Sequence, residues 1–270
     1  MATIAILTSA KESPRTGPAS AWYEVGRNNY LAEELTRRNH QVVMWWDEPE
    51  GELLAPHPDL VVIRSGKKTN VARARALADR GIRVYNDPDQ HDRASDKWIT
   101  AQVLTSAGIP HPPTTLALGP RTEEVVVLKQ RRSSGGHGVE KIRGDLTPND
   151  ENFIVQPLLA WDDDLRATVI DGKVVYTLRR RPAPGEWRTN LAQGAHFENA
   201  GQIPTEAQEL AIEATRAMNL SWGGVDLLLT PGGWTVLEVN PGTTLYGAHP
   251  DDGLHIVSAL SDFLERELRR

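Results

Sequence analysis

The chain of 270 residues contains no cysteine. This absence excludes disulfides, thiolate zinc sites, iron–sulfur clusters and cysteine nucleophiles, and it suits a reducing cytoplasm. No apolar run reaches the roughly 18 residues that a membrane-spanning helix needs, and Met1-Ala2-Thr3 leads into apolar Ile4–Leu7 without a signal-like region. We therefore expect a cytoplasmic protein without a membrane partner.

A surplus of positive charge is also missing, since 30 Lys and Arg residues face 36 Asp and Glu residues, for a net charge of −6. Non-specific nucleic-acid binding needs a broad positive field. The basic run Arg179-Arg180-Arg181 has no interleaved aromatic residues, so it suits the phosphates of a small ligand better than a nucleic acid. No GxSxG elbow and no HExxH pair is present, which argues against the common hydrolases.

The sequence predicts an α/β protein in three parts. The first third alternates short apolar runs with helical patterns, as a parallel sheet requires, and Asn86-Asp87-Pro88 ends this rhythm. One helix is predicted over Arg93–Ala107, and from Pro112 onward closely spaced strands favour antiparallel sheets. A capping box, Thr205-x-x-Gln208, begins a later amphipathic helix. The expected parts are an N-terminal domain at 1–88, a central lobe at 89–158 and a C-terminal lobe at 159–270.

Two hairpins are predicted in the C-terminal lobe. Asp171-Gly172 is a two-residue turn signal. If the second hairpin turns at Gly232, Asp226 lies opposite Glu238, with Cβ atoms roughly 5 Å apart. Asn240 lies two residues further along and shares their face.

Two carboxylates close together inside an apolar sheet need a proton or a cation between them. With the amide of Asn240 they form an all-oxygen set that suits Mg²⁺, with Mn²⁺ as a substitute, and phosphate oxygens complete the coordination. The alternative is that Asp226 and Glu238 lie on a solvated outer face of the hairpin. The metal interpretation is the one we pursue.

A glycine-rich loop follows another strand. Lys129 ends the apolar run Val125–Leu128, and Ser133–Val139 comes next. An ammonium group and the backbone N–H groups of such a loop can bind phosphates, although a flexible turn is the ordinary use of such glycines. Lys97, near the start of the predicted helix, is by itself a surface lysine.

The order of these parts resembles the ATP-grasp superfamily, and most of all its RimK-type carboxylate–amine ligases. The resemblance covers about residues 84–245. It rests on the following parts in order: Asp96-Lys97, Gly108-Ile109-Pro110, Lys129 with its glycine loop, Asp164-Leu165-Arg166, Arg188-Thr189-Asn190, and Asp226, Glu238 and Asn240.

The resemblance implies an ATP-grasp fold, with ATP held between two lobes that contain antiparallel sheets. It also implies roles for individual residues. Arg166, Arg179, Arg188 and Asn190 would surround the reacting groups; Lys97, Lys129, Ser134, Gly136, His137, Gly138, Gln156, Leu158 and Asp164 would bind ATP; and Asp226, Glu238 and Asn240 would bind the metal. Pro157 departs from the pattern, because an acidic residue is common there and proline donates no N–H.

The implied reaction is attack of a substrate carboxylate on the γ-phosphate of ATP, followed by attack of an amine on the acyl phosphate. The product is a peptide-type amide, with ADP and phosphate released. We expect an amino acid or a peptide with a free carboxylate, an amine acceptor, and a homodimer or homotetramer. Arg15 and Arg64 are candidates for holding a substrate carboxylate or are surface residues. A phosphotransferase and a non-catalytic nucleotide-binding regulator are the alternative functions.

Overall fold

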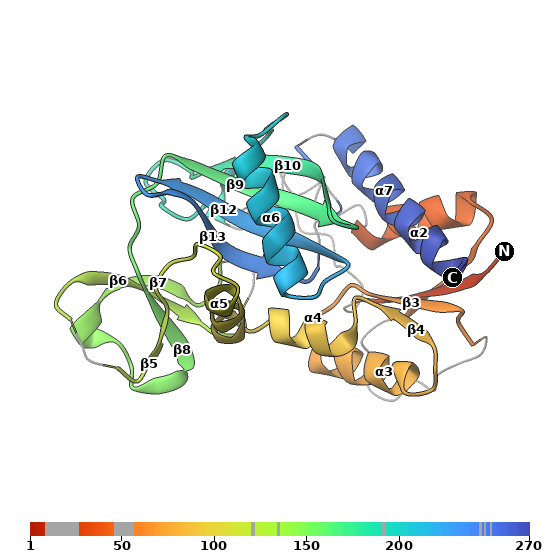
Figure 1. The fold of residues 1–270 in the computed structure, drawn as a ribbon, viewed down its shortest axis with the longest axis horizontal. Helices are drawn as coiled ribbons and strands as arrows, with labels where there is room; N and C mark the ends of the chain where they lie inside the picture. Colours follow the sequence, from red (N-terminus) through yellow and green to blue (C-terminus); the bar gives the residue numbers. More distant parts are fainter. Residues whose placement is uncertain are drawn as a thin grey trace.

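The computed structural model describes residues 1–8, 27–45, 57–119, 122–133, 136–190, 193–242, 245, 247–248 and 250–270. Within these residues the chain forms three sheets, and Figure 1 shows them as three separate groups of strands joined by helices. The sheets fall in the first third, the middle and the C-terminal part of the sequence.

The N-terminal sheet is parallel, with strand order β2-β1-β3-β4. Its central strands are buried on both faces and are almost entirely aliphatic, as the covered strands of a parallel sheet require. The elements are β1 (Thr3–Leu7), α2 (Arg27–Arg37), β2 (Gln41–Trp45), β3 (Leu60–Ile63), α3 (Lys68–Ala78) and β4 (Arg83–Tyr85).

Two helices, not one, connect this sheet to the central lobe. The prediction of a single helix over Arg93–Ala107 is wrong: α4 (Pro88–Ala94) ends before Ser95, and α5 (Lys97–Ser106) begins after Asp96. Asp96 has extended backbone angles, and its carboxylate accepts hydrogen bonds from the first backbone N–H groups of α5. An aspartate N-cap therefore starts a second helix at this point.

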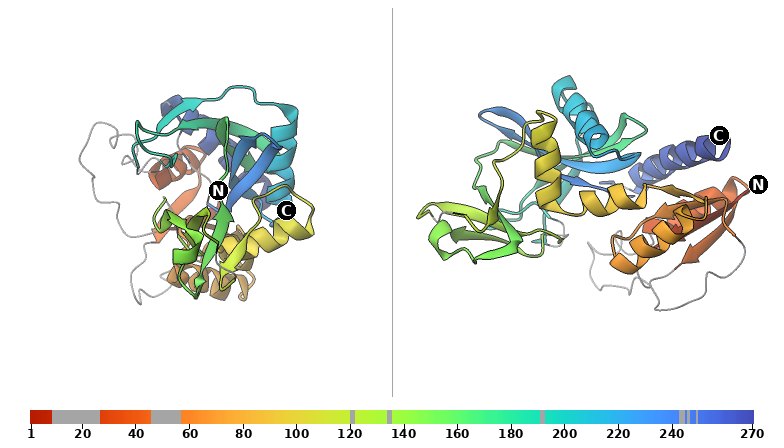
Figure 2. Two further views of the ribbon diagram at one scale, coloured as in Figure 1. Left: turned by 90° about the vertical axis from the view of Figure 1, so that its left-hand side faces the viewer. Right: turned by 60° about the horizontal axis from the view of Figure 1, so that its bottom comes forward.

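The central lobe is a four-stranded antiparallel sheet with order β5-β8-β6-β7. Both ends of the lobe connect through single chain segments, and Figure 2 shows it set apart from the N-terminal sheet with α5 between them. Its strands are β5 (Thr115–Ala117), β6 (Val125–Gln130), β7 (Val139–Arg143) and β8 (Asp150–Pro157), with a short 3₁₀ turn, η1 (Gly144–Leu146), after β7.

The C-terminal sheet has order β11-β10-β9-β12-β13 and is antiparallel throughout. The predicted turn at Asp171-Gly172 is confirmed, because both residues adopt positive φ angles of 51° and 68°. The strands are β9 (Asp163–Ile170), β10 (Lys173–Arg181), β11 (His196–Asn199), β12 (Trp222–Thr230) and β13 (Gly233–Asn240).

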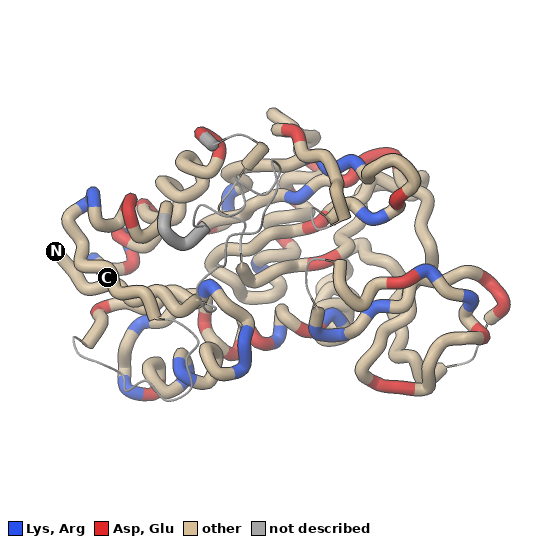
Figure 3. Tube along the Cα trace, turned by 180° about the vertical axis from the view of Figure 1, so that it is seen from behind, with Lys and Arg blue, Asp and Glu red and all other residues tan. Residues whose placement is uncertain are grey.

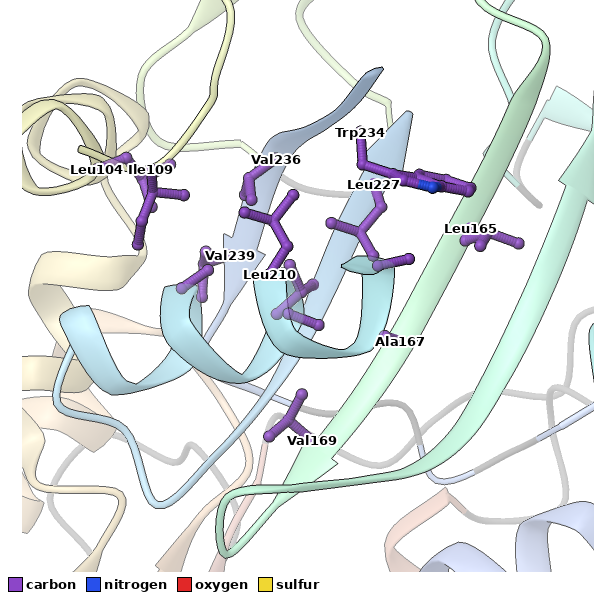
Figure 4. Close-up of a cluster of buried hydrophobic side chains, with 14 of the residues drawn as sticks. Leu104, Ile109, Leu165, Ala167, Val169, Leu210, Leu227, Trp234, Val236 and Val239 are labelled. Carbon is purple, nitrogen blue, oxygen red and sulfur yellow. The ribbon is translucent and has the colours of Figure 1, made fainter. Parts of the chain in front are cut away.

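One face of this sheet packs on α6 (Thr205–Ala217). Figure 4 shows apolar side chains of β9, β12 and β13 pointing toward Leu210 on this helix, with Leu104 and Ile109 closing one end of the cluster. The predicted capping box is wrong, because Pro204 occupies the N-cap and no side chain caps the helix. Gln208 instead donates to the carbonyl of Ile203. The opposite face is apolar at one end, where Ile170, Tyr176, Leu178 and Trp222 pack with residues of the last helix, and carries charged side chains at the other end.

The last helix, α7 (Pro250–Leu268), returns to the N-terminal part of the chain and lies beside α2 (Figure 1). Arg38 links the two helices through Glu34, Asp262 and Glu265. Ile4, Leu31, Trp222 and Leu260 belong to one buried cluster. The first and last parts of the chain therefore share a core, which fixes the N-terminal sheet against the C-terminal sheet.

In the view of Figure 3, positions of Lys and Arg are interspersed with positions of Asp and Glu across all three sheets. None of the helices in the described part of the chain has the length and apolar character needed to cross a membrane.

Candidate active site

Charged side chains gather on the face of the C-terminal sheet opposite α6. Apolar residues of β9 and β12, such as Leu165 and Leu227, alternate with them and pack toward the helix. Because side chains alternate along a strand, the charged residues share the other face. They are Asp164, Arg166, Arg180, Asp226 and Glu238.

Asp226 lies directly opposite Glu238, as the sequence predicts. The register that produces this pairing differs from the predicted one. Thr230 pairs with Gly233 across the turn, and a regular hairpin with this register would place Leu237 opposite Asp226. A bulge next to Asp226 adds one residue to β13 and moves Glu238 into that position. Without the bulge, Glu238 would share the core-facing side of Val236.

Two guanidinium groups hold the Asp226 carboxylate. Arg166 donates to it in a bidentate pair, with Nε–Oδ1 and Nη2–Oδ2 distances of 2.6 and 2.7 Å. Arg180 Nη1 lies 3.2 Å from Oδ2. Burial raises the pKa of Asp226, but the arginines outweigh it, so the pKa lies below its ordinary value. Asp226 is therefore an anion in the sheet interior.

The same Arg180 guanidinium also binds Asp164, through Nε at 2.7 Å and through Nη2. The Thr189 hydroxyl donates to the other oxygen of Asp164. Both Asp164 and Arg180 are almost fully buried, and burial raises the pKa of Asp164 above its ordinary value. Both oxygens of Asp164 are thus paired with protein groups.

Arg179 does not reach this cluster. It pairs with Asp163 and lies 3.8 Å from Glu198, and its backbone stands opposite Leu165. A bulge between Val174 and Tyr176 shifts the register of β10 and directs the next residue, Arg180, to Asp164 and Asp226. Within the arginine run, Arg180 and not Arg179 contacts Asp164 and Asp226.

Two lysines from different elements lie near Glu238. Lys97, at the start of α5, lies 3.1 Å from Glu238 through its Nζ and donates to the Ser133 carbonyl at 2.7 Å. Lys129, on β6, lies nearby. Burial lowers the pKa of Lys129 to about 8, and the neighbouring Glu238 offsets part of this effect.

Lys97, Lys129 and Glu238 line one pocket between the central and C-terminal sheets. Gln156 lies on its β8 wall and donates to the Thr114 hydroxyl at 2.9 Å, and the bulge residue Leu237 contributes part of the β13 wall. The pocket combines apolar walls with two cations and one carboxylate, as a nucleotide site requires. Leu158 does not line it and is 41% exposed.

The glycine loop approaches the C-terminal lobe. Gly136 has φ of +76°, and a Cβ built there would lie 2.6 Å from the Asn190 Oδ1 atom. Gly138, also at positive φ, accepts a hydrogen bond from the Gln130 N–H through its carbonyl, and His137 is exposed. Ser134 lies outside the described residues, as does Arg15.

Arg188 lies in the same segment as Asn190. It forms a bidentate pair with Glu186 and also donates to Gln193. The hydrogen bond from Arg188 lowers the pKa of Glu186 to about 2. Arg64 directly follows β3, in the N-terminal sheet.

The donor set fits a metal ion that arrives with phosphate oxygens. Among the described residues no three His, Asp or Glu side chains form a metal cage. Asp226 and Glu238 supply two adjacent carboxylates. Asn240, which pairs with Gly224 two residues further along, adds an amide on the same face; its amide nitrogen lies 3.4 Å from the Gly224 carbonyl oxygen. This all-oxygen set suits Mg²⁺ or Mn²⁺.

Comparison with known proteins agrees with this chemistry. Residues 94–264, more than half of the chain, match the RimK-like ATP-grasp domain family. The chain belongs to the RimK-like ATP-grasp family. A protein from Xanthomonas euvesicatoria pv. vesicatoria named probable alpha-L-glutamate ligase is 32% identical over 239 residues, covering 78% of this chain and 79% of that protein.

A second relative with that name, from Parasynechococcus marenigrum, is 30% identical over 217 residues. That match covers 73% of this chain and 46% of the relative, so this chain spans about half of the longer protein. The assignment to the RimK-like ATP-grasp family rests on the family match and on the Xanthomonas relative.

Solved structures show the same ATP-grasp fold. D-alanine–D-alanine ligase from Bacillus anthracis complexed with ATP matches with a TM-score of 0.73 at 16% identity, over 100% of this chain and 98% of that one. A RimK domain ATP-grasp protein from Sphaerobacter thermophilus matches with a TM-score of 0.69 at 17% identity, over 97% and 99%. The chain thus shares the fold of ATP-grasp ligases, and its family match is consistent with ATP-dependent carboxylate–amine ligation.

Proposed function

We propose that this chain activates a carboxylate as an acyl phosphate at the expense of ATP and joins it to an amine, releasing ADP and phosphate. The observation that carries the proposal is the meeting of Lys97, Lys129 and Glu238 at one pocket, with Asp226 paired to Glu238 across the hairpin. This arrangement provides cations for phosphates and carboxylates for a divalent cation at a single place.

Each residue has a role in this proposal. Bound Mg²⁺·ATP supplies the electrophilic phosphoryl group and divalent charge, and Asp226, Glu238 and Asn240 would hold the cation. Lys97 and Lys129 bind phosphate oxygens. Leu237 and Gln156 line the pocket that takes the base.

The arginines have separate roles. Arg166 is one-fifth exposed and pairs with Asp226, whereas Arg180 is buried, so Arg166 is the guanidinium that can bind the developing acyl phosphate. Arg180 is buried and holds Asp226 and Asp164 in place. Arg188 and Asn190 lie in the segment that meets Gly136, where they bind phosphates from the C-terminal lobe. The chain needs no general base for the first step, because a carboxylate is already nucleophilic.

An amino acid or a short peptide is the proposed substrate class, and glutamate is the amine to test first. The relatives named alpha-L-glutamate ligase support this choice. An ion-paired site that reaches solvent at Arg166 and Glu238 suits a small charged substrate.

Oxygen-isotope transfer tests the proposal. A substrate carboxylate labelled with ¹⁸O should pass one labelled oxygen to the released phosphate, because that oxygen attacks the γ-phosphorus and stays with it when the amine displaces phosphate. Phosphate without label, formed together with the amide, would contradict the acyl-phosphate route. A stable phosphorylated product would identify a phosphotransferase, and nucleotide binding without turnover would identify a regulator.

A further inference from the structure

The two lysines of the pocket come from different parts of the chain. Lys97 begins α5, in the connection from the N-terminal domain, and Lys129 lies on β6 of the central lobe. Both are cations beside one pocket, so their mutual repulsion favours moving them apart unless the surrounding backbone is fixed. The structure contains a direct link between the two elements.

Asp96 and Arg131 form that link. Arg131 follows β6, and its Nε and Nη2 atoms donate to Asp96 Oδ1 and Oδ2 at 3.1 and 2.7 Å. Asp96 is 2% exposed, and burial raises its pKa while Arg131 outweighs this effect and keeps the pKa below its ordinary value. A bidentate, charge-assisted pair is stronger than a single neutral hydrogen bond, and it fixes the relative orientation of the two side chains.

The backbone of the same residues completes the link. The Lys97 N–H donates to the Arg131 carbonyl at 3.0 Å, and the Arg131 N–H donates to the Asn152 carbonyl on β8 at 2.8 Å. Arg131 Nη1 also donates to the Glu151 carbonyl at 3.2 Å. The first residue of α5 and the residues after β6 are thus fixed to each other and to β8.

We propose that Asp96 and Arg131 are a positioning pair that keeps Lys97 and Lys129 aligned on the phosphates of one bound nucleotide. Neither residue of the pair lines the pocket. They act through the two lysines, one on each side of the link. The inference rests on the proposed nucleotide site and adds residues that the reaction itself does not require.

Asp96 also caps α5, so its substitution must separate capping from positioning. Asp96→Ser keeps a good N-cap side chain and removes the ion pair with Arg131. Arg131→Gln leaves Asp96 with its two cap bonds and with Arg132, whose Nε lies 3.5 Å away. A matched control is Arg143→Gln, because Arg143 forms an exposed bidentate pair with Asp145 in the same lobe.

The test measures the dissociation constant of Mg²⁺ with a non-hydrolysable ATP analogue by calorimetry, on the full chain. Asp96→Ser and Arg131→Gln should each weaken binding ~10-fold, and the double variant should be no weaker than the singles, because both remove one interaction. Arg143→Gln should change binding less than about twofold. Thermal unfolding should show that all variants are folded at the assay temperature, since Asp96→Ser retains the cap and Arg131→Gln leaves Arg132 beside Asp96.

A second comparison tests directly whether Arg131 keeps Lys97 aligned on the nucleotide. Lys97→Met should weaken binding about threefold less in the Arg131→Gln background than in the wild type, because the lysine is no longer held in position. Equal losses in both backgrounds, additive losses in the double variant, or wild-type binding by both single variants would overturn the positioning role. If the wild-type chain binds no nucleotide, the proposed function fails as well, so the two failures are distinguishable.

Discussion

Asp226 and Glu238 lie directly opposite each other on β12 and β13, although the turn between these strands sets a register that is one residue different. The bulge at Leu237 shifts the register by one residue and so brings Glu238 opposite Asp226. It also directs Leu237 toward the nucleotide pocket. One extra residue in an edge strand therefore places a carboxylate on the polar face and an apolar side chain at the wall of the pocket.

Glu238→Gln should lower kcat by about 10²–10³-fold while the fold stays intact, because it removes a charge at the metal and phosphate site with little change in volume. Steady-state ADP release and the circular dichroism spectrum are the measurements. Glu198→Gln, on β11, where the carboxylate pairs with Arg179 and Arg181, is the control and should keep its activity. Wild-type turnover by Glu238→Gln would contradict the assignment.

Arg180→Met should lower the free energy of unfolding by about 3–5 kcal/mol, because it leaves the buried carboxylates of Asp164 and Asp226 without a shared cation. Arg179→Met removes only a more exposed pair with Asp163 and should cost about 1 kcal/mol or less. Urea unfolding measures both. Equal losses for the two variants would show that the choice between the neighbouring arginines is wrong.

Activity should depend on the charge of Lys129. Burial lowers the pKa of this lysine to about 8, and only the protonated form attracts phosphate. The kcat/KM for ATP should therefore fall as the pH rises through about 8, approaching tenfold per pH unit. Lys129→Arg stays charged, so this decline should move to higher pH. An unchanged decline in Lys129→Arg would assign it to another group.

Gly136→Ala should impair turnover about tenfold or more, because the new Cβ would meet Asn190 at 2.6 Å. Gly172→Ala is a matched control: Gly172 also has a positive φ, but a Cβ there meets no atom within 4 Å. Both variants carry the backbone strain of about 1 kcal/mol, and only Gly136→Ala should lose activity. Similar kinetics for the two variants would mean that the contact with Asn190 is irrelevant to catalysis.

The fold was predictable because its signals are local and repeated. Apolar runs marked the strands, and Asp171-Gly172 marked a turn. A turn centred on Gly232 gave the pairing of Asp226 with Glu238 that the structure produces through a two-residue turn and a bulge. The order of the charged residues along the chain then indicated the family.

The errors came from features that depend on single residues or on tertiary contacts. Asp96 splits the expected helix, because an aspartate in an extended conformation caps a new one. The bulge near Val175 exchanges the faces of Arg179 and Arg180, and no periodicity in the sequence marks it. The role of Arg131 depends on a contact with Asp96 that lies 35 residues away along the chain. A short-range pattern carries no information about such a pair.

The most direct test of the account is analysis of the nucleotide products after the purified chain is mixed with Mg²⁺, ATP, and pools of amino acids, short peptides and small carboxylates. The account predicts ADP and phosphate in equal amounts with a new amide, only with pools that contain both a carboxylate and an amine substrate, and product formation about 10²–10³-fold slower with Glu238→Gln. AMP and pyrophosphate would mean that the carboxylate is adenylated, and would contradict the acyl-phosphate mechanism.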